Sequence, residues 1–148
     1  MNAYEFMKKA GELTSRDQKL YYDFAKAHGI HYNTLGVLYT CYVNKGCTQK
    51  RVTIEWYVPK QTVNTICKEL ISEGILEKRK SSGDHRESVI SLTEKGEKFA
   101  EPIVEKLLEI ESGVMKSLGD SEAAIFLEKY TRFSDAMVKE FTKADKGR

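Results

Sequence analysis

The stretch Thr48–Lys95, TQKRVTIEWYVPKQTVNTICKELISEGILEKRKSSGDHRESVISLTEK, decides the fold because its residue pattern changes from helical to strand-like and back. Apolar residues recur at helical spacing after Pro59, and Gly74 is a natural end for that helix. The expected apolar stripe is Val63, Ile66, Leu70 and Ile71. Two short helices, a two-strand hairpin and the start of a further helix therefore follow one another, which is the order of a winged helix-turn-helix.

The opposite face of the helix after Pro59 carries polar side chains that suit DNA. Gln and Asn can pair with the edge of adenine, Lys with guanine, and all of them can contact phosphates. They gather toward the start of the helix, where a recognition helix meets the major groove. The candidate DNA-binding residues are Lys60, Gln61, Thr62, Asn64, Thr65 and Lys68. An ordinary solvated face is the alternative, because such side chains are mostly exposed in any protein.

Two segments of alternating residues, 75–80 and 88–92, flank a turn-forming segment at 81–87 and predict a β-hairpin wing. The tip of this wing carries Asp84, His85 and Arg86. An arginine on such a loop could enter a narrow minor groove, while the aspartate fixes the loop or the arginine. A solvated hairpin tip is the alternative.

The segment 59–96 resembles the MarR (multiple antibiotic resistance regulator) family. The resemblance rests on the helix after Pro59, on the Asp-x-Arg wing of Asp84 and Arg86, and on the Leu-Thr-x-x-Gly exit of Leu92, Thr93 and Gly96. It implies a mainly α fold with a small β-wing (α+β). A winged helix-turn-helix DNA-binding lobe is expected at residues 31–96, and N- and C-terminal helices from residues 1–30 and 97–148 are expected to form a dimerisation region.

Helices are also expected on both sides of this lobe. The first covers residues 13–28 and stops at Gly29, and the second ends near residue 45. Thr48 is expected to cap the third helix. In that helix the residues available for packing are Val52, Trp56 and Tyr57.

The C-terminal third is expected to form two further helices. Thr93 caps the first, Pro102 bends it, and a break near Gly119 separates it from the second. The apolar stripes are Phe99, Ile103, Leu107, Ile110 and Val114 in the first, and Leu127, Tyr130, Phe133, Met137 and Phe141 in the second. This apolar surface exceeds what one small domain can cover, which favours a two-fold dimer over packing within one chain.

Composition sets limits on the partners. The chain has 148 residues with 24 basic and 22 acidic side chains, a net charge of +2, so a DNA-binding surface would come from local clustering. The N-terminal stretch lacks the long apolar core of a signal peptide, and no segment is apolar enough for a bilayer. The expectation is a cytoplasmic protein without a membrane partner.

Motifs for catalysis do not occur in the sequence, which has no Gly-rich phosphate loop, no His-Glu-x-x-His and no nucleophile elbow. No enzymatic reaction, cofactor or metal is therefore expected. His28 and His31 bracket a turn, where polar turn residues are expected rather than metal ligands.

The three cysteines do not predict a disulfide framework or a zinc knuckle, because their number is odd and no Cys-x-x-Cys spacing occurs. Reduced thiols are expected, with Cys67 packing as a small hydrophobe. Cys41 and Cys47 could sense oxidants, as cysteines in some relatives do.

A group of aromatic residues marks a candidate effector site at Tyr21, Phe24, Tyr39 and Tyr42. In the resembled family these helices line a cleft where small aromatic or phenolic effectors bind, while core and dimer packing is the alternative. The resulting hypothesis is a homodimeric repressor on a pseudo-palindromic DNA operator, released by a small molecule. The alternatives are a winged-helix protein-interaction module without DNA binding and a thiol-based redox-sensing regulator.

Overall fold

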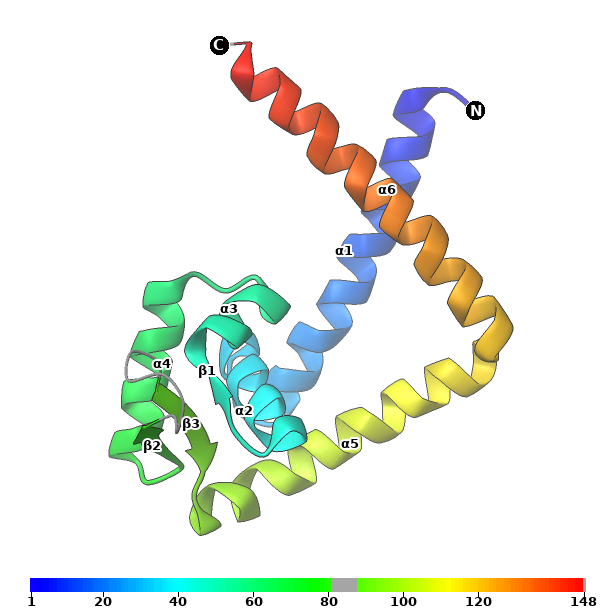
Figure 1. Cartoon of the computed structure of the whole chain (residues 1–148). Helices are drawn as coiled ribbons and strands as arrows, with labels where there is room; N and C mark the ends of the chain where they lie inside the picture. Colours follow the sequence, from blue (N-terminus) through cyan, green and yellow to red (C-terminus); the bar gives the residue numbers. More distant parts are fainter. Residues whose placement is uncertain (81–87, 148) are drawn as a thin grey trace. The chain divides into compact units, whose positions relative to one another are not determined.

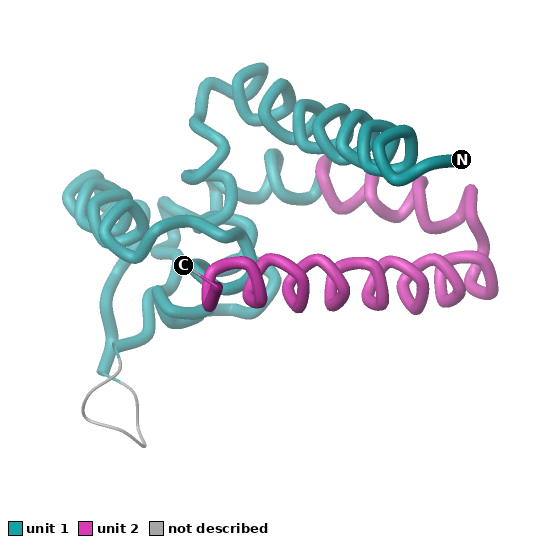
Figure 2. Tube along the Cα trace, turned by 90° about the horizontal axis from the view of Figure 1, so that it is seen from above, with its two compact units in different colours: residues 1–105 teal, residues 106–148 magenta. Residues whose placement is uncertain are grey.

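The computed structural model describes residues 1–80 and 88–147 (Figure 1). In chain order the elements are α1 (Ala3–Ala27), α2 (Tyr32–Asn44), β1 (Cys47–Thr48), α3 (Gln49–Trp56), α4 (Lys60–Ser72), β2 (Leu76–Lys80), β3 (Ser88–Leu92), α5 (Glu94–Leu118) and α6 (Asp120–Lys146). The chain divides within α5 into two compact units, residues 1–105 and 106–148 (Figure 2). The division by function into residues 31–96 and the two flanking segments stays a prediction.

Helices α2, α3 and α4 enclose the core of the first unit. Leu35 and Leu38 of α2, Val52 of α3 and Val63 of α4 are fully buried. Burying each such side chain stabilises the fold by about 1.5–3 kcal/mol. These four side chains hold the three helices of the helix-turn-helix together.

Local hydrogen bonds set where these helices begin. The His31 ring accepts a hydrogen bond from the Asn33 amide at the start of α2, and the Thr48 hydroxyl accepts one from the Arg51 amide at the start of α3. The predicted Thr48 cap is thus confirmed. Gly74, with a φ of 72°, follows α4 as the sequence predicts.

The strands form an antiparallel sheet in the order β1-β3-β2. The predicted hairpin corresponds to β2 and β3, paired from Leu76 with Leu92 to Lys80 with Ser88. The prediction of two strands is incomplete, because β1 also pairs with β3, Cys47 opposite Ile90. A strand of two residues is too short to produce an alternating pattern, so the sequence carries no signal for it.

The Leu-Thr-x-x-Gly motif, Leu92 to Gly96, forms the junction between β3 and α5. The Thr93 hydroxyl donates a hydrogen bond to the Gly74 carbonyl at 2.5 Å and accepts one from the Gly96 amide at 2.9 Å, which caps α5. A Cβ atom at Gly96 would lie only 2.0 Å from the Ile75 carbonyl oxygen. Glycine is therefore required where α5 crosses the start of the wing.

Three details of the predicted helices are wrong. α1 begins at Ala3 instead of near residue 13, and Asn2 and Glu5 form a capping box at its start. The buried face of α4 consists of Val63, Cys67 and Leu70, with Cys67 at its centre. Ile71, which was predicted to lie on this face, is 36% exposed. Tyr57 does not pack, since it ends α3 at a φ of 52° and is 94% exposed.

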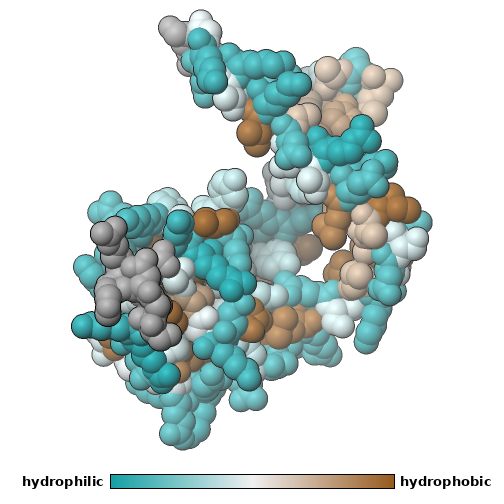
Figure 3. Space-filling model, viewed as in Figure 1, coloured by the Kyte–Doolittle hydropathy of each residue, from teal (hydrophilic) through white to brown (hydrophobic). Residues whose placement is uncertain are grey.

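The second unit contains the distal part of α5 and the whole of α6. The predicted break is confirmed at Gly119, which has a φ of 79° and directly precedes α6. Large apolar side chains lie at the surface of this unit, and Figure 3 displays such a surface in brown near the junction of α5 and α6. They include Val114, Met115, Leu118, Ile125, Phe126 and Leu127. No helix in the described part of the chain is long and apolar enough to cross a membrane.

Candidate nucleic-acid interface

α4 turns a polar face away from the core. Gln61, Thr65 and Lys68 are exposed on this face, which lies opposite the buried side chains of Val63 and Cys67. Of the other predicted residues on the helix, Lys60 is exposed, and Thr62 and Asn64 are half-buried. The fold therefore places all six predicted residues of this helix on α4 with at least part of each side chain accessible.

The start of α4 is suited to an anion. Pro59 occupies the N-cap position and makes no side-chain capping hydrogen bond. The first amide groups of a helix have no partner within it, and the helix dipole places partial positive charge there. With Lys60 beside this end, the first turn can receive a phosphate group.

A groove of about 390 Å³ separates the start of α2 from α4. α4 contributes Gln61, Thr62 and Thr65, and α2 contributes Asn33 and Thr34. Sequence reasoning missed the α2 side of this groove. Its only signal was a run of polar residues in the first turn of α2, which by itself does not indicate a neighbour.

The wing carries basic side chains toward its tip. Lys78, Arg79 and Lys80 of β2 are exposed, and Arg79 forms an ion pair with Glu77. The sequence signal was three consecutive basic residues, which the prediction of site residues did not include. The predicted wing residues Asp84, His85 and Arg86 lie outside the described residues.

Comparisons with known proteins agree with this geometry. A family model described as MarR family matches residues 28–87, which contain α2, α3, α4 and β2. The solved structure of NMB1585, a MarR family regulator from Neisseria meningitidis, is 27% identical, covers 97% of this chain and 99% of its own, and has a TM-score of 0.84. The chain is similar to the MarR family over residues 28–87 and to a MarR family regulator over nearly its whole length. The proteins that it resembles are transcription regulators with a winged helix-turn-helix, and MarR family regulators are not enzymes.

Two similar structures contain ligands. PcaV from Streptomyces coelicolor, in complex with its natural ligand, is 21% identical, covers 93% of this chain and 99% of its own, and has a TM-score of 0.64. NadR in complex with 4-hydroxyphenylacetate is 17% identical, covers 84% of this chain and 89% of its own, and has a TM-score of 0.67. At these identities the likeness shows the MarR fold alone. None of the curated proteins matches the chain.

The candidate effector residues do not form one cluster in their described contacts. Tyr21 and Tyr39 both meet the ring of Trp56, at centroid distances of 6.4 and 5.6 Å. The Phe24 ring lies 4.2 Å from the ring of His28 instead. Trp56, which the sequence offered only as a packing residue, is thus the common neighbour of two of the four.

Tyr42 makes its described contact with α5. Its hydroxyl donates a hydrogen bond to Glu105 Oε1 at 2.7 Å. This hydrogen bond, more than any other cause, raises the pKa of Tyr42 to about 12. The contact joins α2 to the proximal half of α5.

The two turn histidines take part in local backbone contacts. His28 Nδ1 donates to the Phe24 carbonyl at 2.8 Å, and His31 Nδ1 accepts from the Asn33 amide at 3.1 Å. Among the described residues no three His, Cys, Asp or Glu side chains gather as metal ligands would. Cys67 is fully buried in α4, which raises the pKa of its thiol to about 12 and confirms its packing role.

Proposed function

We propose that this protein is a homodimeric repressor of a pseudo-palindromic operator. Each copy places α4 in the major groove, and the two grooves are about 10 base pairs apart. The polar face of α4 carries the proposal, because Gln61, Thr65 and Lys68 face solvent while Val63 and Cys67 anchor the helix. A protein-interaction module without DNA binding has no need for such a set at the start of this helix.

The proposed contacts follow from side-chain chemistry. Gln61 and Asn64 read base edges, because their amides both donate and accept hydrogen bonds. Lys60 and Lys68 neutralise phosphates, and Thr62 and Thr65 contact either group. At the wing, Asp84, His85 and Arg86 approach the minor groove.

Selection of bound fragments from random DNA with the purified protein tests the proposal and supplies the operator. At this site Gln61→Ala should cost about 1–3 kcal/mol of binding free energy and relax the choice at one base position. The matched control is Ser72→Ala, an exposed residue in the last turn of the same helix, which should leave affinity unchanged. Equal losses on all DNA sequences would contradict base reading by Gln61.

The wing contact has a different signature. Arg86→Ala should weaken binding to every DNA sequence, because Arg86 is proposed to contact phosphate or the negative potential of the minor groove. The slope of log affinity against log salt concentration should fall by about one. Measuring affinity over a range of salt concentrations gives the slope. An unchanged slope with unchanged affinity would remove Arg86 from the interface.

We also propose that a small aromatic or phenolic acid binds near Tyr21, Phe24, Tyr39 and Tyr42 and weakens operator binding. Support comes from the Trp56 contacts of Tyr21 and Tyr39, and from the ligands in the PcaV and NadR structures. The two recognition helices fit successive grooves at one separation only, so a ligand that favours another separation lowers affinity.

Thermodynamic reciprocity tests this regulation. Candidate acids are titrated by calorimetry into free protein and into protein saturated with operator. The ligand must bind the DNA complex more weakly by the same factor by which it weakens DNA binding, typically about 5- to 150-fold. Equal affinity for both forms of the protein would refute the effector proposal and leave the operator proposal standing.

A further inference from the structure

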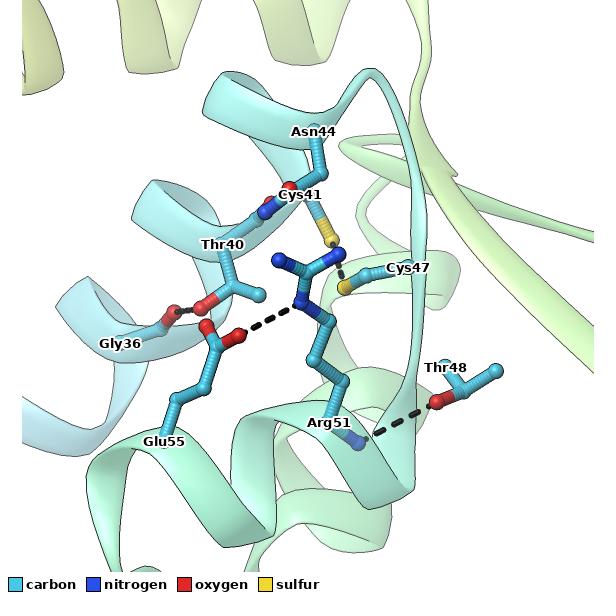
Figure 4. Close-up of polar contacts among 8 residues, drawn as sticks. All are labelled: Gly36, Thr40, Cys41, Asn44, Cys47, Thr48, Arg51 and Glu55. Atoms are coloured by element: carbon cyan, nitrogen blue, oxygen red, sulfur yellow. Dashed lines mark hydrogen bonds and ion pairs between the residues drawn. The ribbon is translucent and has the colours of Figure 1, made fainter.

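Two buried thiols meet where α2, the wing and the start of α3 join. Figure 4 shows Cys41 near the end of α2 and Cys47 opposite it, with their Sγ atoms 3.4 Å apart. The two residues are only 1% and 6% exposed. Cys47 pairs with Ile90 of β3, and Cys41 Sγ lies 3.9 Å from the Ile90 carbonyl oxygen.

The backbone between the two cysteines holds them in place. Lys45 has a φ of 53° and Gly46 a φ of 118°, and the Gly46 amide donates to the Cys41 carbonyl at 2.9 Å. A Cβ atom at Gly46 would lie 3.2 Å from Val89 Cγ1, so β3 closes over the turn. This left-handed turn folds the chain back and brings the thiols together.

The surroundings make the two thiols unequal. The hydrogen bond from Cys41 lowers the pKa of Cys47; burial opposes the change, and the positive charge of Arg51 adds to the lowering. The same hydrogen bond, and then burial, raise the pKa of Cys41 well above its usual range. Arg51 Nε donates a hydrogen bond to Glu55 Oε1 at 2.6 Å, and Figure 4 shows the Arg51 side chain projecting from α3 toward the two thiols. Cys47 therefore ionises first, while Cys41 keeps its proton.

We infer that Cys41 and Cys47 are a dithiol that peroxide oxidises to a disulfide, and that this disulfide lowers operator affinity. The effect on operator affinity rests on the proposed function. The dithiol is a site of covalent modification within one chain, separate from the aromatic residues proposed for an effector.

The reaction balances with a peroxide as the oxidant. The Cys47 thiolate attacks one peroxide oxygen, the O–O bond breaks, and the leaving hydroxide or alkoxide takes a proton, which gives a sulfenic acid on Cys47. Cys41 then attacks this sulfur, its proton and the hydroxyl group leave as water, and the S–S bond forms. Two electrons pass from the dithiol to the peroxide, and an external dithiol reverses the change.

Closing the bond has consequences for the recognition helix. A disulfide requires its sulfurs to lie about 2.05 Å apart, so the two sulfurs must approach by more than 1 Å. Cys47 directly precedes Thr48, whose hydroxyl caps α3, and α3 supports α4 in the core. Because a packed core does not deform freely, the approach shifts the start of α3 and the base of the wing together.

Peptide mapping tests the chemistry directly, because trypsin separates the three cysteines. Cleavage after Lys26, Lys45 and Lys50 puts Cys41 in peptide 27–45 and Cys47 in peptide 46–50, while Cys67 falls in peptide 61–68. After treatment of the full-length protein with hydrogen peroxide, peptides 27–45 and 46–50 should be joined. Cys67→Ala should form the same linked pair. Wild-type protein that forms no such pair would overturn the inference.

Operator binding by reduced, oxidised and re-reduced wild-type protein tests the regulation. Oxidation should lower affinity at least about 5-fold, and dithiothreitol should restore it. Cys41→Ala, which cannot form the bond, should keep its own reduced affinity after brief peroxide treatment. Linked peptides with unchanged affinity, or an equal loss in folded Cys41→Ala, would overturn the regulatory half. Reduced protein that selects no DNA would refute the proposed function instead, whatever the peptides show.

Arg51 supplies a further test that needs no change to either cysteine. Arg51→Met should slow disulfide formation and move its pH profile upward, because the thiolate of Cys47 loses a nearby positive charge. A matched control is Lys50→Met, the exposed neighbour on the same helix. The same slowing in both variants would contradict the role of Arg51.

Discussion

A single close contact fixes the residue at position 96. Any side chain there would push its Cβ into the Ile75 carbonyl oxygen, which is backbone and cannot rotate away. Gly96→Ala should therefore lower the free energy of unfolding by about 1–3 kcal/mol. The control is Gly113→Ala in the same helix, where nothing lies within 4 Å, and it should stabilise by about 0.5–1 kcal/mol. Urea unfolding of both variants measures the difference, and similar values for the two would contradict the steric explanation.

The hydroxyl of Tyr42 should lose its proton at a higher pH than an ordinary tyrosine. Its hydrogen bond to Glu105 raises its pKa to about 12 from the ordinary value of 10.0, so the folded state holds the proton more tightly than the unfolded state does. The resulting stabilisation is complete below about pH 10 and is lost as the pH rises toward 12. Tyrosinate absorbance measures this titration. Glu105→Gln should lower the pKa of Tyr42 toward 10, and Tyr42→Phe should remove the part of the absorbance change that occurs near pH 12. A wild-type curve without that part would contradict the contact.

Individual residues were harder to predict than the pattern they belong to. Cys67 was expected to pack and does, but its central place on the buried face of α4 displaced Ile71 to the surface. Trp56 and Tyr57 are adjacent aromatics in the sequence, yet Trp56 packs against Tyr21 and Tyr39 while Tyr57 is exposed. The left-handed φ of Tyr57 separates them, and no periodicity encodes such an angle.

Among the elements, α3 offers a matched pair of threonines. Thr48 caps the helix, so Thr48→Ala should cost about 1 kcal/mol. The Thr53 hydroxyl is buried and has no hydrogen-bond partner among the described residues, so Thr53→Val should be neutral or slightly stabilising. Thermal unfolding of both variants provides the comparison. A larger loss from Thr53→Val than from Thr48→Ala would indicate that the Thr53 hydroxyl has a partner after all.

The elements that carry strong end signals were predictable. Pro59 and Gly74 bound α4 within a residue or two, and Thr93 and Gly119 mark the start and end of α5. α1 was predicted too short because its first half lacks a clear apolar stripe, although Asn2 and Glu5 carry the capping-box signal. The sequence indicated Cys41 and Cys47 as possible oxidant sensors but not their contact, because only the turn at Lys45 and Gly46 brings these residues together.

At the scale of the whole molecule, the fold was predictable because helix periods, wing alternation and turn residues all indicated the same element order. The sequence also indicated that α5 and α6 carry more apolar residues than one chain covers. The second unit agrees with that expectation, since most of its large apolar side chains are exposed. What covers them cannot follow from one chain, so the dimer stays a prediction that rests on exposed surface and symmetry.

The dimer should depend on the apolar face of α6. Leu127 and Phe141 are 62% and 66% exposed in one chain, and a charge at either position would be costly to bury against a second copy. Wild-type protein should be dimeric at micromolar concentration by analytical ultracentrifugation, and the double variant Leu127→Glu, Phe141→Glu should be monomeric. Losing two-site binding should then weaken operator affinity by about 100-fold or more. The double variant Lys129→Glu, Lys139→Glu changes more charge on the same helix at exposed polar positions, and it should remain dimeric. A wild-type monomer that binds the complete operator with full affinity would remove both the dimer and the two-groove geometry that depends on it.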